Sequence, residues 1–273
     1  MPELPEIEVL RRSLERRLLG RRVVRVRLRA LALREPLDRR ALRALGGARI
    51  SALGRRGKYL LIALDDGRTL AVHLGMSGRL TLSPGAAAPE PHEHLAFELD
   101  SGERLRLRDP RRFGAAFVVP AGGLNVDAHF AHLGREPLGE PLAGAELARL
   151  AARGRGPVKS FLMDGRRVVG VGNIYATEAL FRAGIRPDRG VRRIGAAAWE
   201  RLARAVVEVL EQAIREGGTT LNDFTDGAGA PGEFQISLAV YGREGEACPR
   251  CARRVRRIVQ SGRSSFFCPR CQR

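Results

Sequence analysis

Two identical tetrapeptides, Cys-Pro-Arg-Cys, occupy residues 248–251 and 268–271 and contain the four cysteines of the chain. A Cys-x2-Cys pair lets two thiolates bind one ion, and a hairpin between two such pairs brings four thiolates together. The segment between the pairs has the pattern strand, Ser-Gly turn, strand. Unligated thiol pairs are the alternative, but in a reducing compartment this spacing favours a metal site. The sequence therefore predicts a metal-braced hairpin.

The predicted hairpin is strongly basic, since residues 248–273 contain eight arginines and no acidic residue. Four thiolates complete the tetrahedral ligand set of zinc, so we expect one structural Zn2+ that stiffens a segment too small for its own core. Arg263 follows the Ser-Gly turn, where the metal would hold its guanidinium outward. Phosphate is a natural ligand for this planar donor. The predicted zinc ligands are Cys248, Cys251, Cys268 and Cys271.

The whole chain carries a large positive charge. Its 273 residues have a formal net charge of +18 at pH 7, and all but two of its 48 basic residues are arginine. A charge of this size is costly in a compact fold and usually serves to meet a polyanion such as nucleic acid. The alternative is a solvated arginine-rich surface. No membrane partner is expected, because the chain has no long apolar run.

Hydrophobic periodicity separates a β-rich part from a helical part. Residues 3–19 are predicted as an amphipathic helix with one apolar face, made of Ile7, Leu10, Leu14 and Leu18. Alternating runs and two hairpins, at 58–74 and 94–109, then predict antiparallel strands in two packed sheets. Helices follow at 143–152, 174–183 and 198–215, and a glycine-rich loop at 217–233.

The expected fold class is α+β with two domains: an N-terminal antiparallel β-sandwich with a flanking helix, and a C-terminal helical domain with a zinc-finger β-hairpin. The expected segments are a β-sandwich domain at 1–130, a linker at 131–142, a helical domain at 143–240 and a zinc finger at 241–273.

The first residues, Met-Pro-Glu-Leu-Pro-Glu, lack the basic region and apolar core of a secretory signal, so we expect a cytoplasmic protein. Removal of Met1 would leave Pro2 with a free secondary amine. An α-amino group has a pKa of about 8 and is partly neutral at pH 7, whereas a lysine is almost fully charged. Pro2 is therefore a candidate nucleophile toward a sugar carbon, although it also suits the start of a helix.

Three further residues are candidates beside this amine. Glu3 and Glu6 could exchange protons with a reacting group, or could simply complement the dipole of the helix. Lys58 stands directly after "GRRG" in a chain that otherwise uses arginine. An ammonium can lose a proton when desolvated and a guanidinium effectively cannot. We therefore hypothesise that Lys58 handles protons in addition to binding phosphate.

Several motifs in sequence order resemble those of the bacterial formamidopyrimidine-DNA glycosylases, which act on 8-oxoguanine. These motifs are "MPELPE", "GRRGKYLL", "HLGMSGRL", "RDPRRFG", "GVGNIYATEALF", "GGTTLNDF", "VYGREG" and the closing "GRSSFFCPRCQR". The related endonuclease VIII enzymes share the architecture but typically have glycine at the position of Leu4. Leu4 therefore favours the branch that acts on purine lesions.

The resemblance implies catalytic roles for four residues. Pro2 would form a Schiff base with the sugar, and Glu3 would assist opening of the sugar ring. Lys58 would hold the phosphate beside the lesion. Arg263 would pin the backbone around the extruded nucleotide.

The resemblance also implies a set of DNA contacts. Met76, Arg111 and Phe113 would fill the gap that the extruded nucleotide leaves. Asn173 would lead a helix–two-turns–helix segment whose N-terminus faces phosphate. The remaining predicted DNA contacts are Lys159, Tyr175, Glu6 and His73.

These features predict a bifunctional base-excision repair enzyme. It would remove oxidised purines from duplex DNA through a proline Schiff base and then catalyse β,δ-elimination at the abasic site. It would act as a monomer associated with the nucleoid, with duplex DNA as its partner and one structural Zn2+ as its cofactor. A glycosylase for oxidised pyrimidines and a non-catalytic zinc-hairpin DNA-binding protein are the alternatives.

Overall fold

The computed structural model describes residues 2–219 and 237–273. These residues divide into two compact units: a first unit of residues 2–132 and 216–219, and a second unit of residues 133–215 and 237–273. The predicted loop at 217–233 lies outside the described residues from residue 220 onward. Among the described residues, no helix has the length and apolarity needed to cross a membrane.

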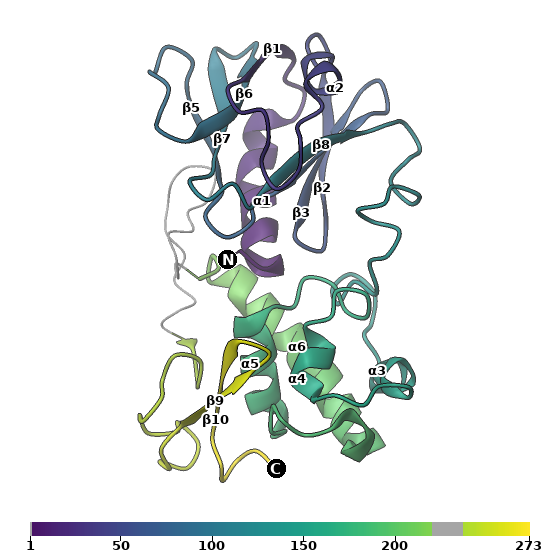
Figure 1. Ribbon diagram of the computed structural model, residues 1–273, viewed down its shortest axis with the longest axis vertical. Coiled ribbons are helices and arrows are strands. Elements are labelled where there is room, and N and C mark those ends of the chain that lie inside the picture. The colour runs from purple at the N-terminus through teal and green to yellow at the C-terminus, as the bar shows by residue number, and fades with distance from the viewer. Residues whose placement is uncertain (1, 220–236) are drawn as a thin grey trace. The chain divides into compact units, whose positions relative to one another are not determined.

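The first unit contains two four-stranded antiparallel sheets (Figure 1), with strand orders β1-β6-β7-β5 and β2-β3-β4-β8. Both predicted hairpins are present, as β3–β4 and β6–β7, and the prediction of two sheets is confirmed. The strands are β1 (Val23–Leu28), β2 (Ile50–Arg56), β3 (Tyr59–Leu64), β4 (Thr69–His73), β5 (Arg79–Pro84), β6 (Glu93–Leu99), β7 (Glu103–Arg108) and β8 (Ala115–Val119).

Helix α1 (Leu4–Leu18) packs its apolar face on β2 and β3. The side chains of that face are at most 1% exposed and belong to the core of the first unit. Burying each such side chain stabilises the fold by about 2 kcal/mol. Gly20 follows the helix with φ +77°, a left-handed conformation that glycine adopts without strain. The predicted helix is therefore confirmed, as are the residues that it buries.

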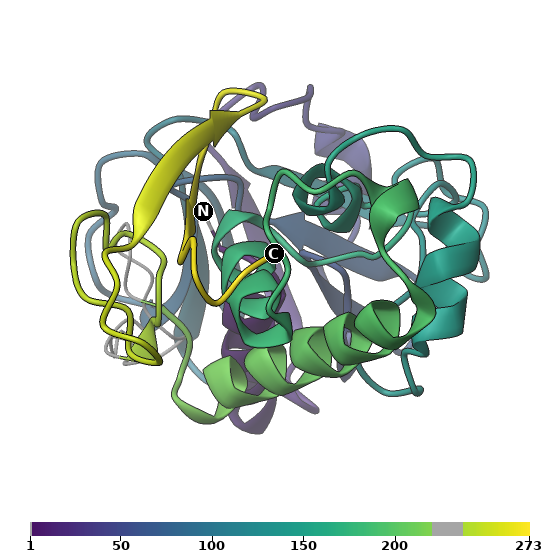
Figure 2. The same ribbon diagram turned by 90° about the horizontal axis from the view of Figure 1, so that it is seen from below.

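The second unit is helical around α5 (Asn173–Ala183) and α6 (Ala196–Arg215), which lie side by side (Figure 2). The predicted stripe of α6 is buried along its length, from Trp199 through Leu210 to Ala213. Helix α3 (Gly144–Ala151) packs on α6. The three helices predicted in this part of the chain are confirmed within a few residues at their ends.

Some short elements were not predicted from the sequence. They include α2 (Arg39–Arg43), α4 (Val158–Leu162), the 3-10 turn η1 (Val191–Arg193) and strands β2 and β5. A helix of five residues does not complete two turns, so it leaves no apolar period to detect. Strand β2 ends in Gly-Arg-Arg, and its pairing with β3 rather than its residue types makes it a strand.

The C-terminal hairpin consists of β9 (Arg256–Gln260) and β10 (Arg263–Phe267), which pair antiparallel. Its turn residues, Ser261 and Gly262, have φ values of +48° and +73°, as tight two-residue hairpin turns require. A small apolar cluster supports the hairpin: Phe181, Val240, Val255 and Phe266 together with Cys248 and Cys268. The predicted strand–turn–strand is confirmed.

Candidate active site, nucleic-acid interface and zinc site

The start of α1 gathers Pro2, Glu3 and Glu6. Pro2 is buried, Glu3 is 2% exposed and Glu6 is 1% exposed. The Glu3 N–H donates to Glu6 Oε2 at 2.7 Å, which forms part of a capping box. Glu6 Oε1 accepts the N–H and the hydroxyl of Thr219 at 3.0 and 3.1 Å. The Glu6 carboxylate is thus bound by protein donors at both oxygens, and its contact with DNA stays a prediction.

Lys58 lies at the tip of the β2–β3 hairpin. Arg56 pairs with Tyr59, which leaves Gly57 and Lys58 as a two-residue turn. Gly57 has φ +56°, a value that such a turn needs at its first position. Lys58 is half-buried. The fold therefore fixes the backbone of Lys58 in a short turn.

His73 ends β4, directly across from Tyr59 on the neighbouring strand. Burial lowers the pKa of His73 to about 3, and the positive charges of Arg34 and Lys58 act in the same direction. His73 is therefore neutral at pH 7, with Nδ1 accepting the Gly75 N–H at 3.0 Å. This acceptor role places the ring proton on Nε2. A neutral His73 can donate a hydrogen bond to phosphate but brings no positive charge.

Met76, Arg111 and Phe113 lie on the two loops that leave β4 and β7. Met76 is 36% exposed and Phe113 is 44% exposed, which is unusual for such large apolar side chains. The Arg111 guanidinium lies 4.6 Å from the centre of the Phe113 ring. The structure thus brings together the three residues predicted to fill the gap in the DNA.

The four cysteines form one cluster in which all sulfur atoms lie within 4.8 Å of one another. The Sγ atoms of Cys248 and Cys271 are 3.9 Å apart, and those of Cys251 and Cys268 are 3.4 Å apart. A zinc ion with Zn–S bonds of about 2.3 Å places tetrahedral sulfurs about 3.8 Å apart. The cluster therefore fits one zinc ion, and four thiolates leave it no open coordination position.

Arg263 begins β10 beside the turn and is exposed. Lys159, from α4, is 2% exposed and lies against the same strand. Its Nζ donates to the Ser264 carbonyl oxygen at 2.9 Å and to Ser265 Oγ at 2.7 Å. Lys159 thereby fixes the strand that carries Arg263, and its own phosphate contact stays a prediction.

Asn173 is the first residue of α5, after Gly172 in extended conformation. Its Nδ2 donates to the Tyr241 hydroxyl at 3.3 Å. Tyr175, two residues further along, is 1% exposed and lies in the core of the second unit. The structure therefore places Asn173 at a helix N-terminus, whereas the Tyr175 ring is packed inside and its DNA contact stays a prediction.

Sequence reasoning missed several residues that organise these sites. Glu178 accepts the backbone N–H groups of residues 239–241 at 2.8–3.0 Å, and burial raises its pKa. Asp109 is fully buried between the loops of Met76 and Phe113. Arg34 donates to the Phe113 carbonyl oxygen. The signal for Asp109 was the motif "RDPRRFG", in which an acid stands among arginines.

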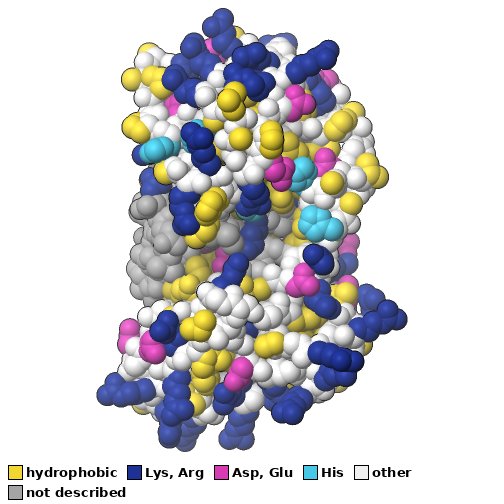
Figure 3. Space-filling view, viewed as in Figure 1, with side chains coloured by type: hydrophobic (Ala, Val, Ile, Leu, Met, Phe, Trp, Pro, Cys, Tyr) yellow, Lys and Arg dark blue, Asp and Glu magenta, His cyan; other side chains and the backbone are white. Residues whose placement is uncertain are grey.

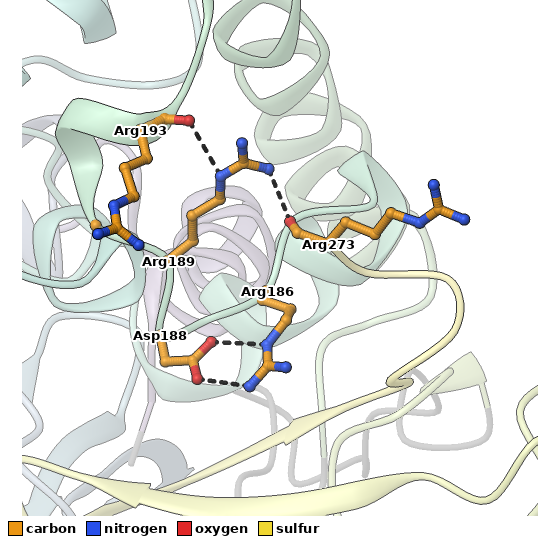
Figure 4. A pocket seen from close by; sticks show the side chains of 6 residues that line it. Arg186, Asp188, Arg189, Arg193 and Arg273 are labelled. Carbon is orange, nitrogen blue, oxygen red and sulfur yellow. Dashed lines mark hydrogen bonds and ion pairs between the residues drawn. The ribbon is translucent and has the colours of Figure 1, made fainter.

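A pocket of about 480 Å³ lies in the segment that follows α5 (Figure 4). Arg189 is held there by the carbonyl oxygens of Arg193 and Arg273 at 3.1 and 3.0 Å, and Arg186 is paired with Asp188 at 2.7 Å. Because α5 is 11 residues and about 16 Å long, this pocket lies at the opposite end of the helix from Asn173.

Basic side chains outnumber acidic ones on the face drawn in Figure 3. Many arginines on this chain are nonetheless paired, as Arg27 is with Glu98 and Arg257 with Glu244. Such exposed pairs contribute little to stability. The net excess of +18 remains available to attract a polyanion.

Three family models match the chain in sequence order. The formamidopyrimidine-DNA glycosylase N-terminal domain matches residues 1–116, the formamidopyrimidine-DNA glycosylase H2TH domain matches residues 133–225, and the zinc finger found in FPG and IleRS matches residues 245–273. This order of domains, with the four-cysteine site, defines the class of zinc-finger DNA glycosylases.

Similar proteins narrow the class to a family. The formamidopyrimidine-DNA glycosylase of Halorhodospira halophila is 50% identical over the full length of both chains. The MutM (Fpg) protein of Thermus thermophilus is 42% identical, with a TM-score of 0.88 over 99% of this chain and 98% of that one. A Lactococcus lactis FPG mutant in complex with Fapy-dG-containing DNA is 30% identical, with a TM-score of 0.92 over all of both chains.

The chain belongs to the formamidopyrimidine-DNA glycosylase family. The family, the fold class, the enzyme class of DNA glycosylase and AP lyase, and the single structural zinc are therefore confirmed as predicted. The catalytic and DNA-binding roles of individual residues stay predictions.

Proposed function

We propose that this protein removes oxidised purines, 8-oxoguanine and formamidopyrimidines, from duplex DNA and then cleaves the abasic strand by β,δ-elimination. The observation that carries the proposal is that Pro2 and its neighbour Glu3 are both buried at the start of α1. A protein that only binds DNA has no need of a buried acid beside a terminal amine.

In the proposed reaction, the Pro2 nitrogen bonds to C1′ of the damaged nucleotide as the bond from C1′ to the base breaks, and the base leaves with the proton that the Pro2 nitrogen loses. Glu3 gives a proton to the ring oxygen O4′ as the C1′–O4′ bond opens, which leaves an iminium ion on Pro2. That cation acidifies C2′, so loss of a C2′ proton expels the 3′ phosphate. Loss of a C4′ proton then expels the 5′ phosphate, and water releases the sugar remnant from Pro2.

Lys58, Asn173 and Arg263 bind backbone phosphates in this proposal, each from a rigid element: a two-residue turn, a helix N-terminus and the zinc hairpin. The neutral His73 donates a further hydrogen bond to a backbone phosphate. In this proposal the protein binds duplex DNA as a monomer. It works in the cytoplasm, at the nucleoid. Domain boundaries near residues 130, 142 and 240 would divide these roles among the catalytic, helical and zinc-finger segments.

Borohydride trapping tests the proposed chemistry. Protein that begins at Pro2 is mixed with an 8-oxoguanine duplex and reduced, and mass spectrometry should find a covalent adduct at Pro2. The matched control is an N-terminally extended variant in which the Pro2 nitrogen is part of a peptide bond, and it should form no adduct. An equal yield from both proteins would contradict the proposal.

Excision rates separate the purine branch from the pyrimidine branch. We expect single-turnover excision of 8-oxoguanine to be faster than that of thymine glycol in duplexes of the same sequence. Faster excision of thymine glycol would assign the protein to oxidised pyrimidines, and intact strands in both cases would favour a DNA-binding protein without catalysis.

A further inference from the structure

The exposed residues Met76, Arg111 and Phe113 stand on two chain crossovers that the topology places side by side. Residues 74–78 pass from β4 to β5, and residues 109–114 return from β7 to β8. Because β4 pairs with β8 and β5 pairs with β7, both crossovers leave the two sheets at the same end. We call residues 74–78 and 109–114 the paired loops.

Asp109 joins the paired loops from beneath. It is fully buried, its Oδ1 accepts the Ser77 hydroxyl at 2.7 Å, and its Oδ2 accepts the Gly114 N–H at 2.8 Å. Ser77 Oγ in turn accepts the Arg111 N–H at 3.3 Å. One buried carboxylate therefore fixes the loop of Met76 and both ends of the segment that carries Arg111 and Phe113.

Two further contacts hold the same segment. The Gly75 backbone approaches so closely that a Cβ atom there would lie 2.4 Å from the Phe113 carbonyl carbon. Arg34 donates from Nε and Nη2 to the Phe113 carbonyl oxygen at 3.0 and 2.7 Å. The backbone beneath Phe113 is thus held from two sides, while the ring itself stays 44% exposed.

We propose that Asp109 is a positioning residue that presets the paired loops for insertion into DNA, so that its loss impairs extrusion of the nucleotide and not the chemistry at the sugar. This inference rests on the proposed function. An inserted side chain contributes most to the free energy of binding when its loop is already ordered, because ordering the loop during binding costs free energy. Burying a carboxylate is itself unfavourable, which makes its full hydrogen bonding to the two loops significant.

The test compares two substrates that differ in their need for extrusion. A duplex lesion must leave the stack before it reacts, whereas an abasic site in single-stranded DNA is already unstacked. For Asp109→Asn we expect single-turnover excision from the 8-oxoguanine duplex to fall by about tenfold to 100-fold. Borohydride trapping on the single-stranded abasic site should stay within about twofold of wild type.

Ser77→Ala is the second variant, because it removes one hydrogen bond and leaves the buried carboxylate in place. It should show the same selective loss at smaller size. Unstacking beside the lesion, followed with 2-aminopurine fluorescence, should slow in both variants. The matched controls are Asp100→Asn and Ser51→Ala, whose side chains are exposed and lie outside the paired loops; both should behave as wild type on both substrates.

Equal losses on the two substrates would overturn the inference, because Asp109 would then act on the chemistry or on the fold as a whole. Unchanged duplex excision in both variants would overturn it as well. Wild-type protein that forms no adduct with either substrate would overturn the proposed function, and the inference with it. A selective loss on the duplex supports both.

Discussion

The paired loops of the first unit and the zinc hairpin of the second unit both present exposed side chains on an ordered backbone, but they obtain that order differently. The paired loops rest on two sheets with a large shared core and are joined by Asp109. The hairpin rests on a cluster of six buried residues, two of them cysteines, and on the ammonium of Lys159.

The two regions differ in how much of their order depends on a single brace. A loop on a large core needs only directed hydrogen bonds, because the sheets already fix its ends. A hairpin with almost no core needs an ion, since the binding free energy of structural zinc is folding free energy. We therefore expect the zinc hairpin to depend on zinc and the first unit to be indifferent to it.

Zinc removal should have the largest effect. Stripping the metal, or Cys268→Ser, should weaken binding to a lesion duplex by about 100-fold or more. Without the metal the hairpin loses its fold, so its arginines are no longer held in position to bind phosphate. Fluorescence anisotropy measures the affinity. Hydrogen exchange in α1 and β3 should be unchanged. Tight binding by stripped protein would mean that Arg263 does not need the metal.

Lys58→Arg should have the next largest effect, and on chemistry rather than affinity. A guanidinium keeps the positive charge but cannot shed a proton, so excision of 8-oxoguanine should fall by about 100-fold. The dissociation constant for the same duplex should change little. If excision by Lys58→Arg equals that of wild type, Lys58 serves only to screen phosphate.

Arg263→Gln should change affinity more modestly. Loss of one charged contact to phosphate should weaken binding about tenfold and lower the slope of log K against log salt concentration by about 0.9. Arg193→Gln is the matched control, because Arg193 lies in the pocket at the other end of α5 from Asn173. A similar loss of slope in both variants would show that the arginines act through net charge alone.

The sequence predicted elements whose pattern is local. The stripe of α1, the stripe of α6 and the Cys-x2-Cys pairs repeat at fixed spacings, so period and spacing identify them. Lys58 stands out in the sequence because lysine is rare in this chain, but the two-residue turn that holds it was not predicted, because strand β2 was not. The assembly of two units was expected from the change in periodicity.

The sequence could not predict contacts between distant segments. Asp109 meets Ser77 across 32 residues and Glu6 meets Thr219 across 213, and neither pair has a spacing that marks it. The burial of Lys159 against β10 was not predicted for the same reason. In a strongly basic chain, a lysine is expected to be exposed and to bind phosphate. Such side chains become interpretable only when the topology places their partners beside them.

His73 offers the smallest test, because it belongs to the brace of the paired loops through its bond from Gly75. The pKa of His73 is lowered to about 3, below its ordinary value of 6.5. The unfolded chain therefore takes up a proton that the folded chain does not, and stability falls as pH falls through 6.5. Between pH 7 and pH 6 the free energy of unfolding should drop by about 0.7 kcal/mol more in wild type than in His73→Gln, measured by urea unfolding. Parallel pH profiles for the two proteins would mean that folding does not lower the pKa of His73.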